Sequence, residues 1–107
     1  MAIIERVTLR SFEKKILKSA IPVLVEFRTS SCESCQEIEP ILERLAGDLR
    51  GKVRIAQVDV EADPQLGMAF AIRYVPTLGL FQDGRLTGMQ VGVPSTDALE
   101  AALRRVA

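Results

Sequence analysis

The stretch from Pro22 to Phe27 constrains the fold of this chain more than any other feature. Its sequence, Pro-Val-Leu-Val-Glu-Phe, is an apolar run rich in β-branched residues, and one acid, Glu26, interrupts it. Consecutive apolar residues of this kind are typical of a strand that is covered on both faces. Such strands belong to the interior of a sheet that has helices on either side. The run therefore predicts an α/β fold.

Helical and strand patterns alternate along the rest of the chain. The 107 residues contain no Pro/Gly/Ser-rich break and no repeat, so we expect one domain over residues 1–107. In chain order, the patterns predict a short strand around residues 3–7, a short helix capped by Ser11, a strand at 22–27, a helix at about 35–49 kinked by Pro40, a strand at 53–60, a helix from Pro64 to Ile72 capped by Asp63, strands at 77–82 and 85–91, and a last helix capped by Ser95 or Thr96.

Connections between these elements indicate how the sheet is built. Asp83-Gly84 is the two-residue signal of a type I′ β-hairpin, so the two strands that flank it should be antiparallel neighbours. Crossovers through helices are expected to join parallel strands. The order is therefore β-α-β-α-β-α-β-β-α, which predicts a three-layer α/β/α domain with a mixed sheet.

Charge and histidine content remove several classes of function. Fourteen acidic and fourteen basic residues cancel, so we expect neither nucleic acid nor a membrane as a partner. Histidine is absent, which removes Ser-His and Cys-His nucleophile pairs and imidazole metal sites. Small-molecule or protein substrates remain.

The start of the chain bears on its cellular location. Charged residues stand at Glu5 and Arg6, so no apolar core of a signal peptide is present there, and no apolar run approaches the roughly 20 residues of a membrane span. We therefore expect a cytoplasmic protein. A chain in which Met1 replaced a cleaved signal peptide would have the same sequence.

The two cysteines, Cys32 and Cys35, form a Cys-x-x-Cys motif between the buried strand and the start of a helix. This spacing places the sulfurs one helical turn apart. The first-turn amides and the helix dipole favour a thiolate at the leading cysteine, and only a thiolate attacks a disulfide sulfur. Cys32 is thus predicted to be the nucleophile. Cys35 is predicted to be the resolving thiol, which closes a Cys32–Cys35 disulfide and releases the reduced substrate.

Three other interpretations of the cysteines are open. Structural zinc takes four ligands, so two cysteines without histidine would require a dimer or carboxylates. A permanent structural disulfide would close only a very short loop in a chain expected to be cytoplasmic. Two inert buried cysteines would disagree with the polar residues Glu33 and Ser34 between them.

The chain resembles the thioredoxin family over essentially all of its 107 residues. The matching segments are the strand Pro22–Phe27, the motif Cys32–Cys35, Pro40-Ile41-Leu42, Tyr74-Val75-Pro76-Thr77, and Phe81-Gln82-Asp83-Gly84 with Val91-Gly92. The spacing between the segments also agrees. The resemblance implies the thioredoxin fold and thiol–disulfide oxidoreductase activity.

The same resemblance implies a substrate groove. Pro76 would be cis and lie beside the cysteines, and the backbone of Val75 would pair with an extended substrate chain. Gly92 and Val93 would complete the groove. The simpler alternative is an ordinary turn proline before a strand.

Glu26 stands where the resemblance implies a buried acid that takes or gives the proton of Cys35. An acid within an apolar strand should have a raised pKa because burial disfavours its charged form. The simpler alternative is a strand residue that faces solvent.

Three departures from the family pattern concern the site. Ser31-Cys32-Glu33-Ser34-Cys35 replaces Trp-Cys-Gly-Pro-Cys, Arg28 replaces an aromatic residue, and Gln57 replaces a lysine often paired with the buried acid. Glu33 opposes thiolate formation at Cys32, and Arg28 is a cation that would act in the opposite sense. We therefore interpret Glu33, Ser34 and Arg28 as residues that tune the redox reaction. The missing tryptophan fits a specialised protein at least as well as a general reductant.

Two classes of function fit these residues. The leading hypothesis is dithiol–disulfide exchange with protein substrates, in the direction of disulfide reduction, by a monomer without metal or cofactor. The chain has no flavin or nicotinamide fingerprint, so a separate thioredoxin-reductase-like donor would supply electrons. The alternative is a binding module or adaptor that uses the groove at Val75 and Pro76 with little redox turnover. Both cysteines and Glu26 favour the enzyme, whereas Glu33-Ser34 and the missing tryptophan favour the adaptor.

Overall fold

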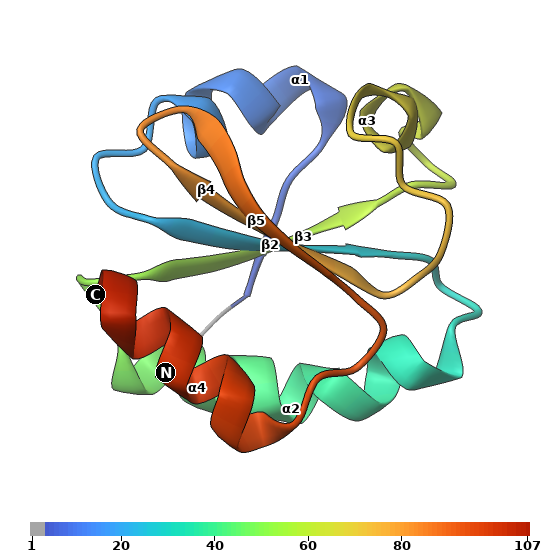
Figure 1. Ribbon diagram of the computed structural model, residues 1–107. Helices are drawn as coiled ribbons and strands as arrows, with labels where there is room; N and C mark the ends of the chain where they lie inside the picture. Colours follow the sequence, from blue (N-terminus) through green and yellow to red (C-terminus); the bar gives the residue numbers. More distant parts are fainter. Residues whose placement is uncertain (1–3) are drawn as a thin grey trace.

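A five-stranded sheet lies between two layers of helices in the computed structural model, which describes residues 4–107 (Figure 1). The strands are β1 (Glu5–Arg6), β2 (Val23–Arg28), β3 (Arg54–Asp59), β4 (Thr77–Gln82) and β5 (Arg85–Val91). The helices are α1 (Leu9–Phe12), which continues as the π-helix η1 (Glu13–Leu17), α2 (Glu33–Asp48), α3 (Pro64–Ala69) and α4 (Thr96–Val106). The predicted order of elements and the three-layer fold are confirmed.

The strands follow the order β1-β3-β2-β4-β5 across the sheet. β3 is parallel to β1 and β2, whereas β4 is antiparallel to β2 and β5. The expectation that every helical crossover joins parallel strands is therefore wrong for α3. A six-residue helix is about 9 Å long and a six-residue strand about 20 Å, so α3 does not carry the chain back along the sheet. β4 begins at the end of the sheet where β3 stops.

Alternating side chains of β2 divide the core into two layers. Val23, Val25 and Phe27 pack on the face that α1, η1 and α3 cover, and Leu24 packs on the opposite face under α2 and α4 (Figure 1). Because side chains alternate along a strand, Glu26 shares the face of Leu24. The sheet therefore directs the only acid of β2 into the layer beneath α2.

Two helix boundaries differ from the predictions. Thr8, not Ser11, precedes the first helix, and the Oγ of Ser11 accepts a hydrogen bond from the Thr8 backbone N–H at 3.1 Å. Helix α3 ends at Ala69 rather than at Ile72, because Ala71 adopts a left-handed conformation with φ 55°. Ile3, which belongs to the predicted first strand, lies outside the described residues.

The closing hairpin and the last helix follow local signals closely. Asp83 and Gly84 both have positive φ, 52° and 77°, as a type I′ turn requires. Ser95 is the cap of α4, and its Oγ accepts a hydrogen bond from the Ala98 N–H at 3.1 Å. Within residues 4–107, none of the helices combines the length and the apolar character that a bilayer crossing requires.

Candidate active site

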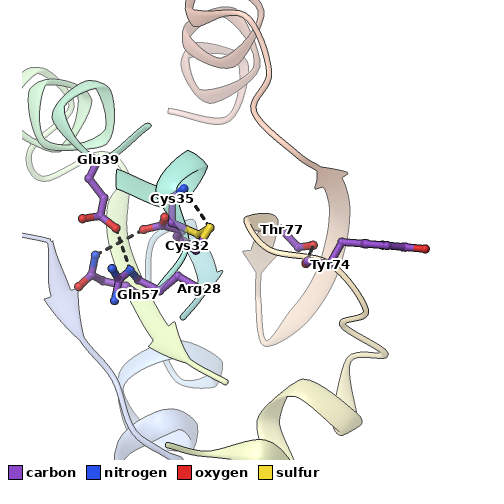
Figure 2. Close-up of a disulfide and its surroundings, with 8 residues drawn as sticks. Arg28, Cys32, Cys35, Glu39, Gln57, Tyr74 and Thr77 are labelled. Carbon is purple, nitrogen blue, oxygen red and sulfur yellow. Dashed lines mark hydrogen bonds and ion pairs between the residues drawn. A yellow bond between two sulfur atoms is a disulfide. The ribbon is translucent and has the colours of Figure 1, made fainter. Parts of the chain in front are cut away.

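Cys32 and Cys35 are joined by a disulfide at the N-terminus of α2, and their Cα atoms are 5.2 Å apart (Figure 2). Cys32 has an extended backbone, and its Sγ accepts a hydrogen bond from the Cys35 backbone N–H at 3.0 Å. Because this sulfur caps the helix, α2 begins at Glu33, two residues before the predicted start. The nucleophile predicted from the sequence thus lies at the positive end of the helix dipole.

The two sulfur-bearing residues differ in their access to solvent. Cys35 is fully buried, whereas Cys32 is partly exposed. Cys35 belongs to the apolar stripe of α2 that continues through Ile38 and Leu42, and this stripe faces the sheet. A large substrate can therefore approach Cys32 from outside, while Cys35 is reached only from within the protein.

Glu26 is fully buried, which confirms its expected burial and contradicts the solvent-facing alternative. Its neighbours in the sheet register are Gln57 on β3 and Leu78 on β4. The Gln57 side-chain N–H donates a hydrogen bond to Glu26 Oε1 at 3.4 Å. Glu26 Oε2 is buried and has no hydrogen-bond partner within residues 4–107. A carboxylate in this position is poorly solvated.

The pKa of Glu26 is raised to about 7. Burial is the largest cause because it disfavours the charged form, and the neighbouring Glu39 carboxylate acts in the same direction. The Arg28 cation and the hydrogen bond from Gln57 oppose this rise. A carboxyl group that titrates near neutral pH can both take and give a proton under physiological conditions.

An ion pair between Arg28 and Glu39 lies beside this acid. The Arg28 Nε donates to Glu39 Oε2 at 2.8 Å, and the two side chains are 14% and 26% exposed. Figure 2 shows Arg28, Glu39 and Gln57 together on one side of the disulfide. Arg28, predicted to act on Cys32, thus pairs with Glu39.

Glu39 was not predicted from the sequence to be a site residue. It lies four residues after Cys35 on the same helix, and residues at this spacing share a helix face. That spacing could have drawn attention to it, but the identity of its partner depends on how α2 packs against the end of β2.

The groove residues predicted from the family resemblance lie together. The Val75–Pro76 peptide bond is cis, as expected, and Pro76 is buried. The Gly92 N–H donates a hydrogen bond to the Pro76 carbonyl at 2.8 Å, so the loop after β5 lies against the proline. Gly92 has φ 84°, a left-handed conformation that favours glycine. Val75 is partly exposed and Val93 is 43% exposed.

Tyr74 extends this surface, although no role was assigned to it from the sequence. Its side chain is 70% exposed, and its carbonyl accepts a hydrogen bond from Thr77 Oγ1 at 2.7 Å. In Figure 2, the Tyr74 ring points away from the disulfide, on the side opposite Arg28 and Glu39. An aromatic residue directly before Val75 and Pro76 was the available signal, because exposed tyrosines commonly contact partners.

The remaining predicted residues lie in the first turn of α2. Glu33 is exposed and Ser34 is partly exposed, so both border the surface next to Cys32. Their role in redox tuning stays a prediction. Among the residues that the structure describes, no three His, Cys, Asp or Glu side chains are grouped so that they could hold a metal ion.

Known proteins share this sequence over most of its length. A family model described as Thioredoxin matches residues 3–105. The thioredoxin of Acidithiobacillus ferridurans is 41% identical over 93 residues, which cover 87% of this chain and 86% of that protein. The thioredoxin of Rickettsia bellii (strain RML369-C) is 36% identical over 93 residues, or 87% and 89% of the two chains. The thioredoxin of Pseudomonas aeruginosa (strain PAO1) is 35% identical over 100 residues, or 94% and 93%.

Proposed function

Because the chain belongs to the thioredoxin family and is a thiol–disulfide oxidoreductase, we propose that it reduces protein disulfides with Cys32 as the nucleophile and Cys35 as the resolving thiol. One observation carries this assignment. Cys32 is partly exposed at the N-terminus of α2, and Cys35, its partner in the disulfide, is fully buried. Only the first sulfur is open to a protein substrate, and only the second is shielded from one.

The proposed reaction has two exchange steps. The Cys32 thiolate attacks one sulfur of the substrate disulfide, which forms a mixed disulfide and releases the other substrate sulfur as a thiolate that takes up a proton. Cys35 then gives its proton to Glu26, and its thiolate attacks Cys32 Sγ. The Cys32–Cys35 bond forms and the second substrate thiolate leaves. The substrate gains two electrons, which the dithiol loses.

We assign Glu26 to the proton transfer because it occupies the same layer as Cys35. Glu26 follows Leu24 on the α2-facing side of β2, and Cys35 precedes Ile38 on the stripe of α2 that packs against Leu24. A buried acid with a pKa of about 7 is suited to accept a thiol proton and to return it when the disulfide is opened.

Substrate binding is assigned to the surface beside Pro76. The partly exposed backbone segment at Val75 can pair with an extended chain, and Gly92 and Val93 form the other wall through the hydrogen bond from Gly92 to Pro76. The apolar side chains of this surface suit unfolded or flexible segments. Glu33 and Ser34 border the same opening and would adjust the redox reaction at Cys32.

A protein that ends each cycle as a disulfide requires an electron donor to begin the next. We infer a separate thioredoxin-reductase-like protein in this role, and a monomeric oxidoreductase that works without a resident cofactor in the cytoplasm. Family membership supports the reductase. The use of both cysteines of the chain in one exchange motif suits a compartment in which thiols are kept reduced.

The test is substrate trapping with Cys35→Ser. Without the resolving thiol, the mixed disulfide should persist, so protein partners should be retained on the variant and released only by a reducing agent. Cys32→Ser is the matched control and should retain none by a covalent bond. Partners that bind all forms equally and elute without reductant would instead identify an adaptor.

A further inference from the structure

Two carboxyl groups and one cation share the partly buried space next to the disulfide. Arg28 Nε contacts Glu39 Oε2 at 2.8 Å, and Glu26, the second carboxyl, is fully buried with one oxygen bonded to Gln57 and the other without a partner within residues 4–107. Glu39 is close enough to Glu26 for its charge to disfavour ionisation there. We call Glu26, Glu39 and Arg28 the acid cluster.

The charges of the acid cluster balance when it holds one proton. Arg28 and an ionised Glu39 form a neutral pair, and a protonated Glu26 adds no charge. A second carboxylate would leave the cluster with one uncompensated negative charge out of contact with water, which is unfavourable. Gln57, which stands opposite Glu26 in the sheet, donates a hydrogen bond but carries no charge that would alter this balance.

The neighbouring elements add little charge to this count. The groups that act on Glu26 or stand beside it in the sheet are Glu39 on α2, Arg28 on its own strand, Gln57 on β3 and the apolar Leu78 on β4. Asp59 stands opposite Arg28 at the end of β3, where its Oδ1 accepts hydrogen bonds from the backbone N–H groups of Glu61 and Ala62.

We propose that Glu39, held by Arg28, is a positioning residue for the acid–base step, in which Glu26 and Glu39 share one proton that Glu39 exchanges with solvent. This inference rests on the proposed role of Glu26. Glu26 is fully buried, whereas the Glu39 side chain is 26% exposed, so Glu39 links the buried acid to water. Glu26 first passes its proton to the Glu39 carboxylate, and Glu39 releases that proton to water. The Glu26 carboxylate then accepts the proton that Cys35 loses. The Arg28 Nε contact holds the Glu39 carboxylate in place beside the buried acid.

The experiment is a titration of the Glu26 side chain by ¹³C NMR in the oxidised protein, with Glu26→Gln to identify its signal. Glu39→Gln should move the Glu26 midpoint to lower pH by about one pH unit or more, because a negative neighbour is lost and Arg28 is left unpaired. Arg28→Gln should move it to higher pH. Glu43→Gln, which changes an exposed acid one turn further along α2, should leave the midpoint unchanged.

Opposite shifts show that both charges of the pair act on Glu26, since loss of a merely structural pair would change the site in the same way in both variants. Proton exchange through Glu39 is tested by the rate of the resolving step, which should be slower in Glu39→Gln than in the wild type when each protein is measured at its own Glu26 midpoint. Equal rates would overturn the inference. Arg28→Lys retains the cation, so the Glu26 midpoint in this variant should lie near the wild-type value. This variant keeps the inference testable if Arg28→Gln does not fold. The pH profile of disulfide exchange should move with the Glu26 midpoint in each variant.

Failure of this inference and failure of the proposed function give different results. If Glu26→Gln changes the pH profile of exchange but Glu39→Gln leaves the Glu26 titration in place, Glu39 has no part in the proton transfer and only the inference is overturned. If Glu26→Gln itself leaves rate and pH profile unchanged, the acid–base role of Glu26 fails first.

Discussion

The two sides of the Cys32–Cys35 disulfide differ in charge, burial and apolar character. On one side, the acid cluster of Glu26, Glu39 and Arg28 is buried or nearly so, charged, and fixed by an ion pair of 2.8 Å. On the other side, Tyr74, Val75, Pro76, Gly92 and Val93 form an apolar surface that we call the groove side, with Tyr74 70% exposed. The disulfide lies between the region to which we assign proton transfer and the region to which we assign partner binding (Figure 2).

If these assignments hold, the domain separates proton transfer from substrate recognition on opposite sides of one disulfide. Desolvation strengthens electrostatic interactions on the acid side. One charge added or removed there should therefore change the ionisation of Glu26 strongly. On the groove side the same change of charge would be screened by water, and contact area matters more. Substitutions on the two sides should therefore alter different properties of one enzyme.

The largest loss of activity is expected for a change of Cys32, which lies between the two sides. Cys32→Ser removes the attacking sulfur, and a hydroxyl cannot form the mixed disulfide, so reduction of a peptide disulfide should fall to the uncatalysed rate. The rate of appearance of substrate thiols measures this. A variant that retained a substantial rate would show that Cys35 attacks substrate directly.

On the acid side, Glu26→Gln should slow the resolving step by about 100-fold near neutral pH, because the buried thiol loses its proton acceptor. Rapid-mixing measurements of the mixed disulfide would show it accumulate and decay slowly. The first attack by Cys32 should keep its wild-type rate. Equal slowing of both steps would mean that Glu26 acts through the structure of the site and not through its proton.

The same variant should also become more stable at alkaline pH. The pKa of Glu26 is about 7 in the folded protein and 4.5 is its ordinary value, so the folded state binds more protons than the unfolded state between these two pH values. Stability therefore falls as pH rises through this window, by about 3 kcal/mol in total. Glu26→Gln should remove that slope and be about 3 kcal/mol more stable than the wild type at pH 8. Urea unfolding of both proteins at pH 5 and pH 8 measures the difference.

On the groove side, Tyr74→Ala should raise the KM for an extended peptide disulfide by about five-fold, which corresponds to about 1 kcal/mol of lost contact. Its kcat, and the rate with a small aromatic disulfide, should not change. Met68→Ala is the control because Met68 is similarly exposed, at 77%, but lies on α3. An unchanged KM in Tyr74→Ala would place substrate binding elsewhere.

The smallest effect is expected at the border between the two sides. Glu33→Gln removes an exposed negative charge next to Cys32, which favours the thiolate and hence the reduced protein. The equilibrium constant with glutathione should change about two- to five-fold toward the dithiol, since exposed charges contribute little. A change in the other direction would contradict a tuning role for Glu33.

Features with local causes could be predicted from the sequence. The bounds of β4 and β5 match the prediction because Asp83-Gly84 fixes both the turn and the strands around it. The burial of Glu26 followed from its apolar neighbours along the strand. The cysteine motif likewise depends on a short segment that starts a helix.

Features that depend on packing between distant segments could not be predicted from the sequence. The antiparallel direction of β4 follows from the short length of α3, and the sequence pattern overestimated that length because Phe70 and Ile72 are apolar core residues beyond the helix end. The pairing of Arg28 with Glu39 requires the end of β2 and the second turn of α2 to meet. No pattern within either segment contains that information.

The most direct test of the central claim is the redox equilibrium of Cys32 and Cys35. The protein is equilibrated in a series of glutathione or dithiothreitol buffers of defined potential, and free thiols are counted from the mass added by a maleimide. The account predicts one reversible transition in which both thiols disappear together, as a two-electron couple requires. If the two cysteines react independently, or if no intramolecular disulfide forms in any buffer, the chain does not work by dithiol–disulfide exchange.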